Sequence, residues 1–189
     1  MIQTDKVLDA KGLACPMPIV RTKKAMKELA PGQVIEVQAT DKGSLADIKA
    51  WAKSSGHQYL GTTEEGDVLK HYLRKASETE EQEEKQFPHT VTNDDLQDQL
   101  SRKDVLVVDV REPAEYAFGH IPGAVSIPLG ELDSRAGELE KDKEIIVICR
   151  TGNRSDFAAK QLADSGFSRV KNAADGMTQW NGPTEQNEA

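Results

Sequence analysis

The chain has 189 residues, of which 37% are hydrophobic and 30% charged, enough for one large domain or two small ones with cores of their own. No apolar stretch is long enough to cross a membrane, and the first residues lack the apolar core of a secretion signal, so we expect a cytoplasmic protein. The net charge of −8 comes from residues 76–189, where 23 acidic side chains face 12 basic ones. This acidity argues against nucleic acid as a partner.

The first 75 residues predict a small sheet with two helices. In chain order we expect strand 6–10, helix 16–29, strand 34–39, helix 44–55, and strands 57–63 and 67–73. Ser44 and Asp47 have the spacing of a capping box at the start of the second helix. The pattern is β-α-β-α-β-β, which predicts a two-layer α/β sandwich over residues 1–75.

Residues 76–87 are interpreted as an acidic linker. The run from Lys75 to Gln86 has almost no apolar side chains and cannot bury surface, although its composition also favours a helix, and docking to a partner stays open. A flexible linker of about twelve residues spans roughly 20 Å. It would hold two domains at an effective concentration in the millimolar range.

Residues 88–189 predict a second domain in which strands and helices alternate. Val105–Asp109 and Ile145–Cys149 are continuous apolar runs, typical of buried parallel strands, and Val170 lies in another short strand. Helices are expected at 93–101, 113–118, 130–138, 154–165 and 176–181. The alternation predicts an α/β domain with a central parallel sheet.

Each unit contains one cysteine, and we expect both to be free thiols. Cys149 ends a buried strand and opens a loop that leads into a helix. Backbone N–H groups of such a loop can point at one sulfur and stabilise a thiolate, with Gly152 able to adopt positive φ. The alternative is a structural cysteine that ends a core strand. The residues expected to bind a substrate are Arg150, Thr151, Gly152, Asn153, Arg154 and Ser155, of which the two arginines suit an anionic donor.

The segment Ile-Cys-Arg-Thr-Gly-Asn-Arg-Ser around Cys149 resembles the active-site loop of rhodaneses, which are sulfurtransferases. The resemblance covers most of residues 88–182 and includes Asp109-Val110-Arg111-Glu112, Glu115-Tyr116, Gly119-His120-Ile121-Pro122-Gly123-Ala124 and Gly176-Met177-Thr178-Gln179-Trp180. It departs at Asp175, where related domains often have glycine. The resemblance implies a rhodanese-like fold in which Cys149 is the nucleophile that forms a persulfide.

Loop length separates this chemistry from phosphate hydrolysis. Cysteine phosphatases that share the rhodanese fold use a loop one residue longer between cysteine and arginine, and the shorter loop from Cys149 to Arg154 suits a persulfide sulfur. Asp109, Arg111 and Glu115 match positions near rhodanese active sites, but a set of ion pairs that stabilises the fold is the favoured alternative. His120 is interpreted as a structural residue, because exchange by a thiolate needs no general base.

Cys15 precedes Pro16, Met17 and Pro18 at the start of a predicted helix. If Pro16 is the first helical residue, Cys15 is the N-cap, the Met17 N–H is free to meet the sulfur, and the helix dipole favours a thiolate. An incidental small residue before a proline-started helix is the alternative. Leu8-Asp9-Ala10, Gly12 and Cys15-Pro16-Met17-Pro18 resemble the signature of TusA-like sulfur carriers, which implies that Cys15 is the carrier thiol. Members that serve tRNA thiolation often have an acidic residue at the position of Met17.

The two resemblances together imply a sulfurtransferase fused to a sulfur carrier. Cys149 would take sulfane sulfur from thiosulfate or a low-molecular-weight persulfide and pass it to Cys15, to another thiol acceptor or to a sulfur-relay protein. A persulfide- or redox-sensing adaptor, in which the first domain only recruits partners, is the alternative. No metal or organic cofactor is indicated. The sequence leaves open the physiological donor and acceptor, the direction of transfer, whether transfer occurs within or between chains, and the oligomeric state.

Overall fold

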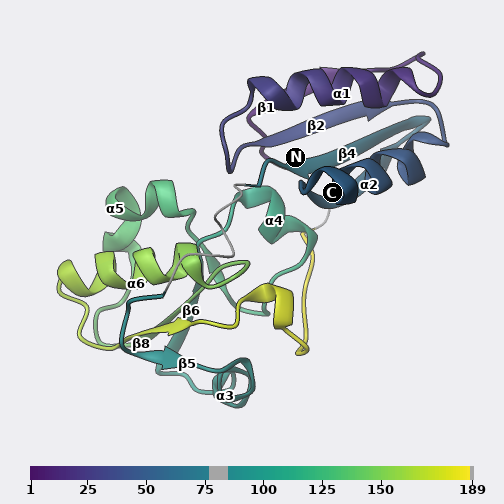
Figure 1. Cartoon of the computed structure of the whole chain (residues 1–189). Helices are drawn as coiled ribbons and strands as arrows, with labels where there is room; N and C mark the ends of the chain where they lie inside the picture. The colour runs from purple at the N-terminus through teal and green to yellow at the C-terminus, as the bar shows by residue number, and fades with distance from the viewer. Residues whose placement is uncertain (77–84, 188–189) are drawn as a thin grey trace. The chain divides into compact units, whose positions relative to one another are not determined.

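The computed structural model describes residues 1–76 and 85–187, which form two compact units (Figure 1). Most of the predicted acidic linker, residues 77–84, lies outside the described residues. The end of that linker differs from the prediction, because Phe87 is buried in the core of the second unit. The N–H groups of Gln86 and Phe87 both donate to Asp156 Oδ1, at 2.9 and 2.7 Å, and this fixes the segment.

The N-terminal unit has the predicted β-α-β-α-β-β order. Its elements are β1 (Lys6–Asp9), α1 (Met17–Glu28), β2 (Val34–Ala39), α2 (Ser44–Ser55), β3 (Gln58–Glu65) and β4 (Val68–Arg74). The strand order is β1-β2-β4-β3, with β1 parallel to β2 and the other pairs antiparallel (Figure 1). Met26 of α1 and Ile48 of α2 join Ile35, Val37 and Leu73 in one core. Both helices therefore cover the same face of the sheet, as expected for a two-layer sandwich.

The starts of both helices differ from the predictions. Helix α1 begins at Met17 with Pro16 as its N-cap, one residue later than expected. Helix α2 has Gly43 as its N-cap and makes no side-chain cap, so the capping box expected from Ser44 and Asp47 is wrong. Both side chains have partners elsewhere. The Ser44 hydroxyl lies 3.0 Å from Nε2 of a histidine on β4, and Asp47 accepts a hydrogen bond from a neighbouring loop.

The C-terminal unit contains a parallel sheet, as predicted. Its elements are β5 (Thr90–Val91), α3 (Asn93–Gln99), β6 (Val105–Asp109), α4 (Pro113–Phe118), β7 (Val125–Ser126), α5 (Leu132–Arg135), β8 (Glu144–Ile148), α6 (Asn153–Asp164) and β9 (Val170–Ala173), with single 3₁₀ turns at Leu129–Glu131, Ala136–Glu138 and Met177–Gln179. The strand order is β5-β9-β8-β6-β7, and every pairing is parallel. The predicted helix at 130–138 is in fact three short pieces. The two-residue strands β5 and β7 escaped prediction because neither contains an apolar run.

Helices lie on both faces of this sheet (Figure 1), and β8 is buried along its whole length. Ile145 and Val147 of β8 pack in one cluster with Leu132 of α5 and Leu162 of α6. The alternate residues of β8 pack in a second cluster, with α3 on the other face. This burial explains the continuous apolar run in the sequence, and it places the end of β8 at the centre of the sheet edge. No helix among residues 1–76 and 85–187 is long and apolar enough to span a membrane.

Candidate functional site

Cys149 follows the last residue of β8 and is fully buried. Two hydrogen-bond donors point at its sulfur. The Gly152 backbone N–H donates to Sγ at 3.1 Å, and the Ser155 hydroxyl lies 3.3 Å from it. Gly152 is the N-cap of α6 and Ser155 lies in its first turn. The carboxyl end of a central parallel strand is where α/β sheets bind ligands, and the donors suit a sulfur that becomes an anion.

Gly152 holds a position that a side chain could not occupy. Its φ is +93°, and a Cβ atom there would lie 2.3 Å from the carbonyl oxygen of Ala174. The close approach of this backbone allows the loop to turn its N–H toward the sulfur. Gly176 makes a matching approach, because its Cβ would lie 2.3 Å from the Arg150 carbonyl oxygen. Glycine at both positions is therefore a steric requirement of the loop.

Asn172 on β9 links two parts of the Cys149 loop and was not predicted as a site residue. Its Oδ1 lies 2.6 Å from the Ser155 hydroxyl oxygen, and its Nδ2 donates to the Gly152 carbonyl oxygen at 3.2 Å. Both Asn172 and Ser155 are fully buried. The Ser155 hydroxyl has one hydrogen, so it donates either to the amide or to the sulfur. The sequence signal for this residue was an uncharged polar side chain at a position next to the predicted strand around Val170.

Arg154 is held by an ion pair within the second unit. Its guanidinium donates to both carboxylate oxygens of Glu115, at 2.8 and 3.0 Å. The Glu115 side chain is fully buried and also accepts the Glu112 backbone N–H at 2.9 Å. The geometry is bidentate, which joins the start of α6 to α4. The ion pair between Arg154 and Glu115 therefore holds the start of α6, next to the Cys149 loop, against α4.

Asp109 and Arg111 form a second buried ion pair. The Arg111 Nη2 donates to Asp109 Oδ2 at 2.7 Å and also to the Gly119 carbonyl oxygen at 2.7 Å. Both side chains are more than 90% buried. His120 is also buried, with Nδ1 2.8 Å from the Tyr116 carbonyl oxygen and its ring stacked on the Tyr116 ring. These contacts join the end of β6 to the segment that follows α4, as expected for residues that stabilise the fold.

Cys15 has the opposite surroundings, because its exposed thiol faces carboxylates. Its Sγ donates to Asp47 Oδ2 at 2.9 Å, and its backbone N–H donates to Asp41 Oδ2 at 3.2 Å. The hydrogen bond to Asp47 raises the pKa of the Cys15 thiol, with further contributions from burial and from the charges of Asp47 and Asp41. A carboxylate that accepts the thiol proton favours the protonated form.

The local contacts predicted to stabilise a thiolate at the start of α1 are therefore wrong. The Met17 N–H, expected to meet the sulfur, donates instead to the Ala14 carbonyl oxygen at 3.0 Å. Pro16 and not Cys15 is the N-cap of the helix, so the sulfur lies one position further from the helix start than the prediction placed it. The sequence motif could not disclose Asp47, which lies 32 residues further along the chain.

The position of Asp47 is fixed by a buried histidine on β4. His71 contacts the Ser44 hydroxyl through Nε2 at 3.0 Å and the Thr62 hydroxyl through Nδ1 at 2.8 Å. Burial lowers the pKa of His71 to about 4, so the imidazole is neutral at pH 7. Ser44 is the first residue of α2. The contact therefore anchors the turn of the helix that carries Asp47.

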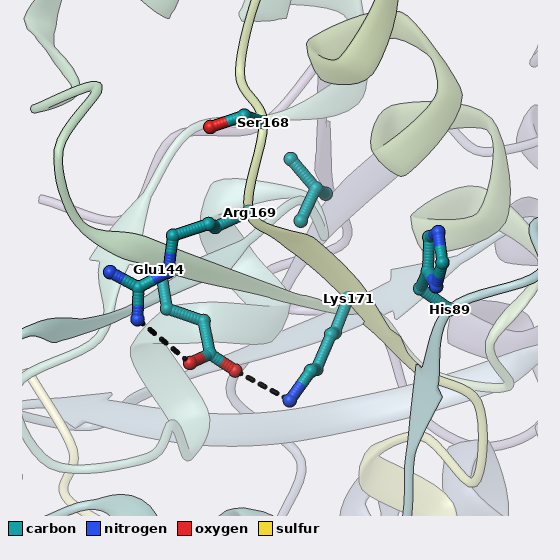
Figure 2. A pocket seen from close by; sticks show the side chains of 6 residues that line it. His89, Glu144, Ser168, Arg169 and Lys171 are labelled. Atoms are coloured by element: carbon teal, nitrogen blue, oxygen red, sulfur yellow. Dashed lines mark hydrogen bonds and ion pairs between the residues drawn. The ribbon is translucent and has the colours of Figure 1, made fainter.

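A cavity of about 290 Å³ lies at the other end of the parallel sheet (Figure 2). Its lining includes Glu144 at the start of β8 and Arg169, Ser168 and Lys171 around the start of β9. Figure 2 shows Glu144 between the two basic side chains, at 3.3 Å from Arg169 and 2.7 Å from Lys171. Cys149 follows the opposite end of β8, so this cavity is not part of the sulfur site.

Models of two protein families match the chain. The model described as sulfurtransferase TusA matches residues 6–75, and the model of a rhodanese-like domain matches residues 92–183. A rhodanese-like domain protein from Staphylococcus aureus, solved by crystallography, superposes with a TM-score of 0.50 at 29% identity over 53% of this chain and 99% of its own. Each half of the chain thus has its own relatives.

One relative contains both halves. YrkF of Bacillus subtilis, a protein named for sulfur carriage, is 50% identical over 185 residues, which are 98% of this chain and 100% of the relative. The sulfur carrier protein TusA of Allochromatium vinosum is 46% identical over 77 residues, 41% of this chain and 100% of its own. The N-terminal unit therefore corresponds to a protein that also exists alone.

Proposed function

We propose a relay of sulfur between the two cysteines of this chain, which belongs to a family of sulfur carrier proteins that join a TusA domain to a rhodanese-like domain. Members of this family take part in sulfur transfer. In this relay Cys149 takes a sulfane sulfur from thiosulfate or a low-molecular-weight persulfide. It then passes the sulfur to Cys15 or to an external thiol acceptor. Cys149 is the catalytic nucleophile and Cys15 the carrier.

The observation that carries this proposal is the pair of donors on the buried Cys149 sulfur, the Gly152 N–H and the Ser155 hydroxyl. With thiosulfate, the Cys149 thiolate forms a bond to the sulfane sulfur while the sulfur–sulfur bond of thiosulfate breaks and sulfite leaves. The product is a persulfide anion in the loop. Donors already aimed at Sγ stabilise the attacking Cys149 thiolate without having to reorganise.

The binding of an anionic donor is assigned to the backbone of the loop and to Arg150. Thr151, Gly152 and Asn153 lie between the two arginines, at the turn where the chain enters α6. Arg154 is kept in the same proposed role, and its two hydrogen bonds with Glu115 orient its guanidinium at the start of α6. Asp109 and Arg111 support the same edge through their buried pair.

The relay is tested by mapping persulfide after the protein is treated with thiosulfate. Mass spectrometry is applied to the wild-type chain and to the Cys149→Ser and Cys15→Ser variants. We expect Cys149→Ser to abolish loading of both positions, and Cys15→Ser to leave loading of Cys149 intact. These variants are matched, because each keeps one of the two thiols.

Other outcomes decide against the relay. If Cys149 is loaded and Cys15 never carries sulfur, the first domain acts as an adaptor that recruits acceptors. If neither thiol accepts sulfur and only affinity for partners changes with oxidation, the protein is a sensor. If Cys15 is loaded equally well in Cys149→Ser, sulfur reaches the carrier directly and the order of the two steps is wrong.

A further inference from the structure

Two carboxylates from outside the cysteine motif converge on Cys15. Asp47 belongs to the first turn of α2, and its Oδ2 accepts a hydrogen bond from the Cys15 thiol at a sulfur–oxygen distance of 2.9 Å. Asp41 belongs to the loop before α2 and accepts the Cys15 backbone N–H at 3.2 Å through Oδ2. Its other oxygen accepts the Gly43 N–H at 3.1 Å, so the orientation of the Asp41 carboxylate is also set.

These carboxylates are part of the framework of the domain. The start of α2 is fixed by the contact between Ser44 and the buried His71, and His71 is held in turn by Thr62 on β3. Asp47 is one turn along from this anchor. The sequence places no acidic residue within two positions of Cys15. The negative charge at this thiol is therefore supplied by the tertiary structure.

We propose that Asp47, with Asp41 beside it, is the specificity-determining residue of the carrier site, and that it selects a sulfur-exchange partner that brings a cationic group to the two carboxylates. The inference rests on the proposed function, because it takes Cys15 to be a thiol that exchanges sulfur. Beyond the proposed function, it specifies the chemistry of the partner with which Cys15 exchanges sulfur.

The reasoning follows from how sulfur exchange occurs. The attacking species is the thiolate, so a carboxylate that holds the proton on Cys15 keeps it unreactive. Thiosulfate and small persulfides are anions and are repelled by Asp41 and Asp47 at short range. A lysine or arginine side chain that pairs with Asp47 offsets its negative charge and so weakens its hold on the thiol proton. The thiol is then released for attack only when the cationic partner is in place.

The transfer step is balanced without an oxidant. The Cys15 sulfur forms a bond to the outer sulfur of the partner's persulfide, and the sulfur–sulfur bond of the partner breaks. The partner leaves as a thiolate and takes up the proton that Cys15 loses. The Cys15 thiol and the partner's persulfide thus become a Cys15 persulfide and a partner thiol. In the resting carrier that proton lies between Cys15 and Asp47.

The test uses the full chain with Cys149→Ser, in which Cys15 is the sole cysteine. The rate of reaction with iodoacetamide is measured against pH, with Asp47 intact and with Asp47→Asn. We expect Asp47→Asn to move the midpoint of the profile to lower pH and to raise the rate at pH 7 about fivefold, the factor for removing a full charge at contact distance in water. Asp47→Glu should restore much of the wild-type profile.

The charge of the partner is tested with two methanethiosulfonate reagents, one carrying a trimethylammonium-ethyl group and the other a sulfonatoethyl group. With Asp47 intact we expect the cationic reagent to react about tenfold faster than the anionic one at low ionic strength. Asp47→Asn should reduce this ratio several-fold, and Asp41→Asn should reduce it by less. Asp67→Asn, which changes an acidic residue in the turn between β3 and β4, is the matched control and should change neither rate.

Each result bears on one part of the proposal. Equal rates for the two reagents, or a ratio that survives Asp47→Asn, would overturn the selection of a cationic partner even if the pH profile moves. A pH profile that does not move would show that Asp47 does not hold the proton. Neither measurement uses sulfur loading, so a failure here is distinct from a failure of the relay, which persulfide mapping decides.

Discussion

The two cysteines of this protein lie in electrostatically opposite environments. The Cys149 sulfur is buried and receives hydrogen bonds from an N–H and a hydroxyl, whereas the exposed Cys15 thiol donates a hydrogen bond to a carboxylate. The same side chain is thus prepared to hold negative charge in one unit and to remain a neutral thiol in the other. A cysteine at the beginning of a helix is therefore not sufficient evidence of an activated thiol.

The two environments also differ in where their groups come from. At Cys149 the donors lie within six residues of the sulfur, in the loop that opens α6. At Cys15 the acceptor lies 32 residues away, on a different helix. A local loop can be recognised from its motif, while a contact between elements depends on the packing of the whole domain. The predictions below alter one environment or the other.

Gly152→Ala should have the largest effect. The added Cβ would lie 2.3 Å from the Ala174 carbonyl oxygen at a φ of +93°, so the loop must move and its N–H leaves the sulfur. Loss of one preorganised donor lowers rates by roughly 10²–10³-fold. We expect a loss of about this size in the rate at which Cys149 takes sulfur from thiosulfate. Gly130→Ala, with open space around its Cβ, is the control, and an equal loss there would show that the effect is not specific to the loop.

Glu115→Ala should destabilise the second unit by about 3 kcal/mol, because it leaves the largely buried Arg154 without the carboxylate that binds it at two points. The free energy of unfolding is measured in urea by Trp180 fluorescence in a Trp51→Phe background, since the chain has two tryptophans. Glu138→Ala breaks an exposed pair with Arg135 and should change stability little. A small effect of Glu115→Ala would mean that the pair is replaced by water.

Acid should weaken the N-terminal unit through His71. Its pKa is lowered by burial to about 4 in the folded state and rises to about 6.5 on unfolding. The unfolded chain therefore binds more protons between these values, so the free energy of unfolding falls as pH falls. Between pH 7 and pH 5 the loss from this group is about 2 kcal/mol.

The measurement of this pH dependence uses Trp51 fluorescence in a Trp180→Phe variant. His71→Gln should flatten the difference between pH 7 and pH 5, because glutamine keeps polar groups at this position but does not titrate in this range. If the wild-type chain and His71→Gln lose the same free energy over this range, His71 is not the group responsible.

Ser155→Ala should have the smallest effect of the four, about a tenfold slower uptake of sulfur at Cys149. The hydroxyl lies 3.3 Å from the sulfur but is shared with Asn172, which it meets at 2.6 Å, so it supplies less than a full donor. Ser134→Ala, which removes an exposed hydroxyl bonded to the Glu131 carbonyl oxygen, is the control. A rate unchanged by Ser155→Ala would assign the stabilisation of the sulfur to backbone N–H groups alone.

Much of the fold could be predicted because its signals are periodic. The apolar run Ile145–Ile148 belongs to a strand buried on both faces, and α2 ends at Ser55, as predicted, with Gly56 in the left-handed conformation after it. The predictions failed where a side chain expected to bond to a neighbour in sequence bonds instead to a residue far away in sequence. Ser44 fits a capping box but bonds to His71, and Asp47 fits the same box but bonds to Cys15. The aromatic side chain of Phe87 packs into a core that a composition rule could not foresee.

The sequence by itself identified the two residues that we propose carry the chemistry: two cysteines, one beside a proline pair and one opening a short loop between a strand and a helix. It also determined the two α/β units, because periodicity and turn residues act over a few neighbouring positions. Only the tertiary structure decided the surroundings of each thiol. The electrostatic surroundings of a sulfur depend on every group within a few ångströms, and at Cys15 the group that matters is a carboxylate brought there by the packing of α2 against the sheet.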